Sequence, residues 1–212
     1  MSADYVIVVQ ARMSSSRFPG KVLASLNGTP ILAHVLNRLA LATPLTEVLV
    51  ATSDRRSDDP VAAYAPTLGV EVVRGPLDDV LERFRVCARL RRREWIGRVN
   101  ADSPLLDAAV VRRVLEARAG EPVDLVTTVF PRTFPIGHNV ELIRTDALMR
   151  LRDDELTPED REHVTRFFYR HPDRFSIRNI ESGEEPGSGE SLAVDTLDDL
   201  RRLEKLSVVQ TG

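Results

Sequence analysis

The stretch Gln10 to Lys21, QARMSSSRFPGK, is the most informative part of this chain. It follows an apolar run from Tyr5 to Val9 that is typical of a buried strand. Ligands of open α/β sheets bind beyond the carboxyl ends of the strands, so a loop that leaves the first strand with Arg12, Arg17 and Lys21 is suited to phosphate. A solvated surface turn is the simpler alternative, and the loop alone leaves it open.

Two common phosphate-binding motifs are absent from the chain. Neither Gly-x-Gly-x-x-Gly nor Gly-x4-Gly-Lys-Ser/Thr occurs in it, which argues against a dinucleotide-binding fold and a P-loop. Pro19 and Gly20 instead shape a turn in which the glycine lets the backbone approach a ligand closely.

Strand-like and helix-like segments alternate over the first 130 residues. Strands are expected at 5–9, 47–52, 70–73, 95–100 and 124–129, and helices at 30–39, 60–68, 79–92 and 107–119. Such alternation predicts an α/β fold with a mostly parallel central sheet and helices on both faces.

The rhythm changes after residue 130. Strands are expected at 139–144, 175–180 and 191–194, a capped helix start at Thr157-Pro158 leading into 162–170, a polar loop at 182–189 and a closing helix from Leu197. No linker separates two domains, so residues 1–212 are interpreted as one domain. The 130–180 region is interpreted as a small insertion whose apolar residues would serve substrate binding or dimerisation.

Composition narrows the function classes. The chain has 212 residues, 42% of them hydrophobic, and a formal net charge of -3, which fits one globular domain and not a general nucleic-acid binder. Its single cysteine, Cys87, lies in a helical apolar pattern and is expected to be a core thiol. Without a basic leader or an 18-residue apolar run, we expect a cytoplasmic protein with no membrane segment.

Two aspartates follow strand-like segments. Asp102 comes after the strand ending at Asn100, and Asp195 comes after Leu192-Ala-Val. Carboxylates of this kind suit Mg²⁺, which keeps water ligands and binds phosphate oxygens. Helix capping is the alternative, because a helix is expected after each aspartate.

Several ordered blocks make the chain resemble the SpsF-like cytidylyltransferases, relatives of CMP-octulosonate synthetase and acylneuraminate cytidylyltransferase. The blocks are QARMSSSRFPGK (10–21), VATSD (50–54), RGPLDDVLERF (74–84), RVNADSPLLD (98–107), PRTFPIGHNVE (131–141), REHVT (161–165) and AVDTLDDL (193–200). The resemblance runs almost from end to end and implies a GT-A-like nucleotidyltransferase fold. It also implies CTP as donor, Mg²⁺ as cofactor, and transfer of CMP to a sugar hydroxyl with release of pyrophosphate.

The resemblance also assigns roles to individual positions. Arg12, Arg17 and Lys21 become catalytic cations, and Asp102 and Asp195 become the metal ligands. The nucleotide-binding set is Gln10, Arg12, Ser15, Ser16, Lys21, Thr52, Asp54, Asp79, Arg83 and Asn100, and the acceptor set is His138, Asn139, Glu141, Arg161 and His163. A homodimer formed through the segment 132–166 is implied as well.

The chain departs from the family pattern at a few positions. Ser14 stands where the family has glycine, Ser16 where it has threonine, and Asn139 where it has aspartate. Residues 100–104 read Asn-Ala-Asp-Ser-Pro where Thr-Gly-Asp-Cys-Pro is usual. The cations and carboxylates remain, so these departures bear on the substrate more than on the activity.

Three alternatives remain open from the sequence. The donor could be another nucleoside triphosphate, or the acceptor a sugar phosphate or phosphonate. A GT-A glycosyltransferase would share the fold, but no two aspartates lie two positions apart as Asp-x-Asp requires. A degenerate nucleotide-binding protein would explain the departures, yet Arg12, Lys21, Asp102 and Asp195 are all retained.

Overall fold

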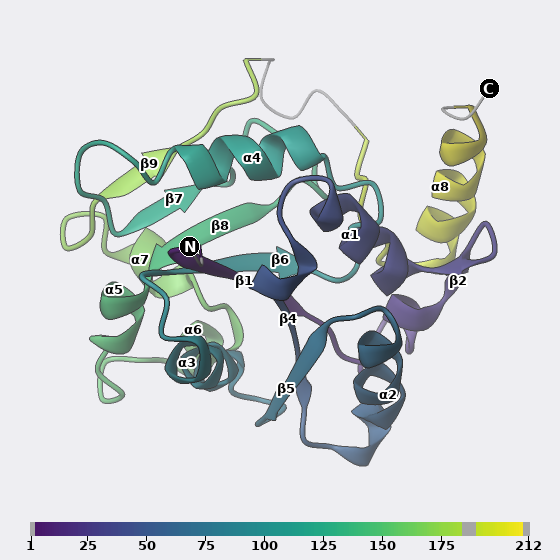
Figure 1. The fold of residues 1–212 in the computed structure, drawn as a ribbon, viewed down its shortest axis with the longest axis horizontal. Helices are drawn as coiled ribbons and strands as arrows, with labels where there is room; N and C mark the ends of the chain where they lie inside the picture. The colour runs from purple at the N-terminus through teal and green to yellow at the C-terminus, as the bar shows by residue number, and fades with distance from the viewer. Residues whose placement is uncertain (1–2, 184–189, 210–212) are drawn as a thin grey trace.

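A computed structural model describes residues 3–183 and 190–209. Part of the loop expected at 182–189, residues 184–189, lies outside the described residues. The core of the molecule is a seven-stranded sheet with the strand order β5-β4-β1-β6-β8-β7-β9 (Figure 1). Only β8 runs antiparallel to its neighbours, so the predicted mostly parallel α/β fold is confirmed.

The elements follow the expected order along the chain. The strands are β1 (Tyr5–Gln10), β2 (Ser25–Leu26), β3 (Thr29–Pro30), β4 (Val48–Ser53), β5 (Glu71–Gly75), β6 (Trp95–Asn100), β7 (Leu125–Thr127), β8 (Val140–Arg144) and β9 (Ile177–Asn179). The α-helices are α1 (Ile31–Ala40), α2 (Asp59–Thr67), α3 (Val80–Arg91), α4 (Ala108–Glu116), α5 (Thr145–Met149), α6 (Pro158–Glu162), α7 (Arg166–Arg170) and α8 (Leu197–Val209).

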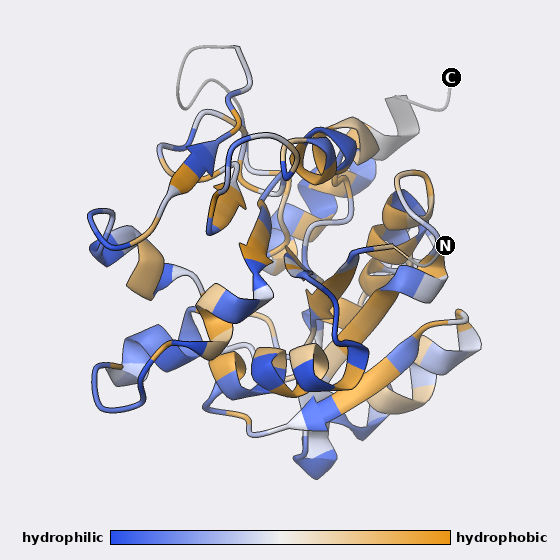
Figure 2. Cartoon of the chain, turned by 60° about the vertical axis from the view of Figure 1, so that its left-hand side comes forward, coloured by the Kyte–Doolittle hydropathy of each residue, from blue (hydrophilic) through white to orange (hydrophobic). Residues whose placement is uncertain are grey.

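The two faces of the sheet are covered by different helices because side chains alternate along each strand. In β1, Ile7 and Val9 face a core shared with α1, α2 and α4, while Val6 and Val8 face a core shared with α3, α5 and α7. Figure 2 shows the strands in mainly hydrophobic colours between these helices. Cys87 is buried in the second of these cores, as predicted, and Trp95 is buried in the first.

The first β-α-β units bring several chain segments to one edge of the sheet. Gln10 at the end of β1 pairs with Ala51 of β4 on one side and with Asn100 of β6 on the other. All three strands are parallel, so the loops that follow them leave at the same edge. The loop after β1 and the loop carrying Asp102 therefore begin side by side.

The expectation of a strand at 191–194 is wrong. This segment makes isolated backbone hydrogen bonds to two different neighbours: Leu192 N donates to Ile136 O at 2.6 Å, and Val194 N donates to Asp102 O at 2.8 Å. Two partners from separate loops do not form a ladder. Gly137 permits this close passage, because a Cβ there would lie 2.7 Å from the carbonyl carbon of Leu192.

The single helix expected at 162–170 is also wrong, because the segment forms two short helices, α6 and α7. A capping box between Thr157 and Asp160 starts α6, as the sequence predicts. The helix ends at Glu162, because the next residue, His163, has a φ of -112° and a ψ of 84°, which are not helical. The break turns the fully buried Val164 into the core. None of the helices in the described ranges is long and apolar enough to cross a membrane.

Candidate active site

The loop after β1 folds back on itself at Gly20. Gly20 has a φ of 76°, the left-handed conformation that glycine adopts without strain, and its N–H donates to Met13 O at 2.8 Å. Within the turn, Phe18 N donates to Ser15 Oγ at 3.4 Å. This closure directs Lys21, at the start of a 3-10 turn, back toward the end of the sheet.

Asp58 anchors the loop from below. Its carboxylate is fully buried and accepts hydrogen bonds from Met13 N at 2.7 Å, from Ser53 N at 3.1 Å and from Ser53 Oγ. Asp58 directly precedes α2, but its side chain makes no capping bond to that helix. A buried carboxylate tying β4 to the loop after β1 leaves no local sequence pattern, so sequence reasoning missed it.

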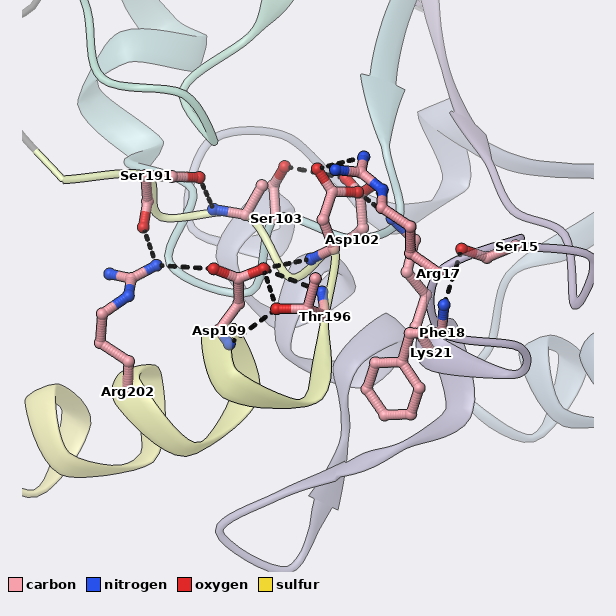
Figure 3. Close-up of polar contacts among 12 residues, drawn as sticks. Ser15, Arg17, Phe18, Lys21, Asp102, Ser103, Ser191, Thr196, Asp199 and Arg202 are labelled. Carbon is pink, nitrogen blue, oxygen red and sulfur yellow. Dashed lines mark hydrogen bonds and ion pairs between the residues drawn. The ribbon is translucent and has the colours of Figure 1, made fainter.

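Lys21 joins the two predicted metal carboxylates. Its Nζ lies 2.7 Å from Asp102 Oδ2 and 2.8 Å from Asp195 Oδ1, and Arg17 Nη2 lies 3.0 Å from Asp195 Oδ2. Asp102 and Asp195 lie 81 and 174 positions after Lys21 in the sequence, and both contact its ammonium group. Figure 3 shows the side chains of Arg17 and Asp102 together at this point.

Neither carboxylate is used as a helix cap. Asp107 caps α4 by accepting from Ala109 N at 2.7 Å. At α8, Thr196 Oγ1 accepts from Asp199 N at 3.2 Å while Asp199 Oδ2 accepts from Thr196 N at 2.8 Å, an arrangement visible in Figure 3. The capping alternative for Asp102 and Asp195 is therefore excluded, and both carboxylates are available for chemistry.

The electrostatics keep Lys21 charged. Burial lowers the pKa of Lys21, but the neighbouring carboxylates of Asp102 and Asp195 outweigh burial, so the pKa is raised above its ordinary value. An ammonium group has three N–H donors, and two are used here. The third remains available to a ligand oxygen.

A cavity of about 340 Å³, here called the loop cavity, opens above these groups. It is lined by Gln10, Arg12, Ser14 to Arg17, Lys21, Arg98, Asn100, Asp102, His163 and Asp195. The backbone N–H groups of Ser14, Ser16 and Arg17 donate no hydrogen bond within the described part of the chain. Unbonded N–H groups beside cations form a concave site for anions.

A second cavity of about 310 Å³, here called the arginine cavity, adjoins the first. Its lining includes Arg98, Asn100, Arg132, Asn139, Glu141, His163, Arg166 and Tyr169. Arg98, Asn100 and His163 line both cavities, so the two share a wall. The predicted acceptor residues Asn139, Glu141 and His163 come together here, whereas Arg98, Arg132 and Arg166 were not predicted.

The remaining predicted nucleotide residues do not line the loop cavity. Asp54 and Asp79 line a wider cavity of about 650 Å³ together with Arg161, which pairs with Asp79 at 2.8 Å. Asp79 also caps α3 by accepting from Glu82 N. Arg83 is 2% exposed and donates to the carbonyls of residues 76 and 77, so it holds the loop that carries Asp79.

Besides Arg83, two other predicted residues line none of these three cavities. Thr52 is fully buried, and its hydroxyl has no hydrogen-bond partner among the described residues. His138 Nε2 lies 3.2 Å from Leu105 O, and its ring packs edge-on against Phe134. Arg12 lines the loop cavity and pairs with Glu162 at 3.0 Å, a partner that the sequence did not predict.

The residues present fit a hard divalent cation. Asp102 and Asp195 face one cavity, but the described residues contain no cluster of three or more acidic, histidine or cysteine ligands. Mg²⁺ is commonly held by one or two carboxylates and completes its shell with water and phosphate oxygens. The pair of carboxylates beside an anion-binding loop matches that pattern.

Fold and site together define a nucleotidyltransferase. The family model described as cytidylyltransferase matches residues 6–206, so the chain belongs to the cytidylyltransferase family. The predicted family and fold are both confirmed.

Individual relatives support this assignment. The chain is 30% identical to an uncharacterized protein of Methanocaldococcus jannaschii over 92% of this chain and 79% of that protein. It is 27% identical to the spore coat polysaccharide biosynthesis protein SpsF of Bacillus subtilis over 96% of this chain and 86% of that protein. A solved cytidylyltransferase from Leptospira borgpetersenii superposes with a TM-score of 0.90 at 27% identity, covering 98% of this chain and 88% of that one.

Proposed function

We propose that this protein transfers CMP from CTP to a hydroxyl group of a sugar, with release of pyrophosphate and with Mg²⁺ as cofactor. The observation that carries the proposal is the meeting of Lys21, Asp102 and Asp195 beneath a loop rich in cations and unbonded N–H groups. Phosphoryl-type transfer requires little covalent chemistry from the protein, because positioning and charge neutralisation provide most of the catalysis.

In this proposal the loop cavity holds the triphosphate. Arg12, Arg17 and Lys21 neutralise its charge, and the N–H groups of the serine segment bind its oxygens. When bound, Mg²⁺ at Asp102 and Asp195 supplies Lewis-acid stabilisation of phosphate oxygens. Lys21 then trades a carboxylate contact for the departing pyrophosphate, which its remaining donor already allows.

The arginine cavity is proposed to hold the acceptor. It shares Arg98, Asn100 and His163 with the loop cavity, so we place the acceptor hydroxyl beside these residues, next to the phosphates. Tyr169 lies in the wall, with Phe130 stacked on its ring at a centroid distance of 4.7 Å. Aromatic faces and polar groups in one wall suit a sugar.

Pyrophosphate release from each of the four ribonucleoside triphosphates tests the donor and the reaction. The assay is run with Mg²⁺ and a panel of neutral sugars, acidic sugars and sugar phosphates. We expect release from CTP with at least one acceptor, and none from the Asp102→Asn/Asp195→Asn variant. Preference for another triphosphate would overturn CTP as donor, and binding of CTP without turnover of any acceptor would favour a degenerate nucleotide-binding protein.

We also propose that the protein forms a homodimer. Support comes from Phe130 and Ile136, which are 39% and 48% exposed at and near the start of the segment 132–166. Light scattering coupled to size-exclusion chromatography should give twice the chain mass for the wild type and a lower mass for Phe130→Ser/Ile136→Ser. A monomeric wild type would contradict the proposal.

A further inference from the structure

Arg98 lies where the two cavities meet and is held there on two sides. Its Nε donates to Gln10 Oε1 at 3.0 Å, and its Nη1 donates to Glu141 Oε2. The side chain is 14% exposed, yet it lines both cavities. Within the described part of the chain, Nη2 makes no hydrogen bond. Two of the three guanidinium nitrogens are therefore held by the protein, and the third, Nη2, is available to a ligand.

Glu141 is itself held from behind. It is 2% exposed and accepts a hydrogen bond from the Tyr169 hydroxyl, which lies 2.7 Å from Thr127 Oγ1. Burial and the Glu141 carboxylate raise the pKa of Tyr169, so the hydroxyl stays protonated and donates. This chain of contacts fixes the orientation of Glu141 and thereby that of Arg98.

A buried ion pair of this kind is poorly explained by stability alone. Desolvation offsets much of the attraction between buried charges, and apolar pairs of similar volume are often equally stable. Arg98 and Asn100 also point to the same side of β6, because residues two positions apart share a face of a strand. The rigid cation is thus directed at the junction of the cavities.

The chemistry of the proposed function predicts which group of the substrate lies where the two cavities meet. The acceptor oxygen forms a bond to the α-phosphorus, and the bond from that phosphorus to the bridging oxygen breaks. The electron pair leaves with pyrophosphate, and the hydroxyl proton is released to water. If the triphosphate occupies the loop cavity and the acceptor the arginine cavity, the α-phosphate must lie where the cavities join.

We propose that Arg98 is a further catalytic residue, whose guanidinium contacts the α-phosphate of the bound nucleotide. Gln10, Glu141 and Tyr169 act as positioning residues that hold it in place. The proposal rests on the proposed function. It differs from the roles of Lys21 and Arg12, which lie at the loop and act on the departing pyrophosphate.

The test compares the affinities for Mg²⁺·CTP and for inorganic pyrophosphate by isothermal titration calorimetry. Arg98→Met alone would leave Glu141 buried without its cation, so the variant used is Arg98→Met/Glu141→Gln, which removes both charges. We expect its CTP affinity to fall about tenfold, the typical effect of losing a charge-assisted hydrogen bond. Pyrophosphate, which has no α-phosphate, should bind within about threefold of wild type.

A matched control lies at the other end of the same two strands. Arg144→Met/Glu94→Gln also removes an ion pair, of 3.0 Å, between the end of β8 and the residue before β6. It should leave both affinities unchanged. Arg98→Lys keeps the charge but lacks the planar fork, so its loss of CTP affinity should be smaller than that of the double variant.

Two results would overturn the assignment. Unchanged CTP affinity would show that Arg98 does not touch the nucleotide, and equal weakening of CTP and pyrophosphate would show a structural role. Wild-type protein that binds pyrophosphate but no nucleoside triphosphate would refute the proposed function itself, and this inference with it. The first two results concern only the variant, so the two failures are distinguishable.

Discussion

The two cavities that meet at Arg98 handle charge differently. In the loop cavity, the pairs Arg12–Glu162 and Arg17–Asp195 have side chains that are 38–64% exposed. In the arginine cavity, the Arg98 and Glu141 side chains are 14% and 2% exposed, and Tyr169 supports the pair from behind. Exposed pairs contribute little stability and exchange partners readily, whereas a buried pair holds its geometry. The pairs of Arg12 and Arg17 are therefore suited to exchanging partners when ions bind, and the Arg98–Glu141 pair to fixing an orientation.

Substitution of Lys21 should give the largest effect, because its ammonium group contacts both Asp102 and Asp195 in the loop cavity. Lys21→Met should lower kcat/KM for CTP at least about a hundredfold, the typical effect of losing a group aimed at developing charge, or about 3 kcal/mol. Steady-state pyrophosphate release measures it.

The control is Lys205→Met, at an exposed lysine of α8, which should retain wild-type kinetics. Near-normal turnover of a folded Lys21→Met protein would show that the loop cavity does not use its central cation. The proposal that the loop cavity binds the triphosphate would then be contradicted.

Substitution of Asp58 should give the second largest effect, because Asp58 holds the loop after β1, which carries Arg12 and Arg17. Asp58→Asn weakens the three hydrogen bonds that the carboxylate accepts from residues 13 and 53. We expect the free energy of unfolding to fall by about 1–3 kcal/mol, with KM for CTP raised about tenfold. Urea unfolding and initial-rate kinetics measure the two quantities.

Asp59→Asn is the matched control for this change. Asp59 is the next residue, and its side chain is 57% exposed in an ion pair with Arg74. It should change the unfolding free energy by less than about 1 kcal/mol. Equal effects at positions 58 and 59 would contradict the anchoring role.

The titration of Tyr169 tests whether the Arg98–Glu141 pair of the arginine cavity is held rigidly. Burial and Glu141 raise the pKa of Tyr169 above the value of about 10 that applies in the unfolded chain. The native protein therefore keeps this proton at pH values at which the unfolded chain has lost it. The sign follows: this contribution to stability is present below about pH 10 and is lost as the pH rises further. Wild type and Tyr169→Phe should show the same absorbance rise at 295 nm up to alkaline unfolding, and an additional titrating tyrosine in wild type would refute this.

Cys87 should give the smallest effect. Burial raises its pKa to about 12, and the side chain is fully buried in the core beneath α3. Because the thiolate is the reactive form, the native protein at pH 8 should not react with a thiol reagent such as dithionitrobenzoate, whereas the urea-unfolded protein should release one equivalent. Rapid reaction of the native protein would show that α3 opens.

The sequence predicted the loop cavity better than the arginine cavity for a physical reason. Arg12, Lys21 and Asp102 lie in the loops that follow two parallel strands, and the direction of those strands brings the loops to one edge. Asp195 was expected after a strand at 191–194 that does not form, and its approach depends instead on the passage of residues 192–194 beside Gly137 and Asp102.

The arginine cavity depends on contacts that neither hydrophobic periodicity nor a sequence motif predicts. Arg98 was taken as part of a buried strand, and Arg166 as part of a helix that the structure divides. Asp58 similarly precedes α2 in the sequence, but its side chain binds the loop after β1. In each case, distant segments determine which neighbour the side chain meets, and local periodicity carries no information about that choice.

The central claim is that Lys21, Asp102 and Asp195 belong to one nucleotide–metal site. Calorimetric titration of CTP with Mg²⁺ and with EDTA, in wild type and in Asp102→Asn/Asp195→Asn, tests it most directly. Wild type should bind CTP at least about tenfold more tightly with Mg²⁺, about 1.4 kcal/mol, and the double variant should show no metal effect. A metal effect of equal size in both proteins would contradict the claim.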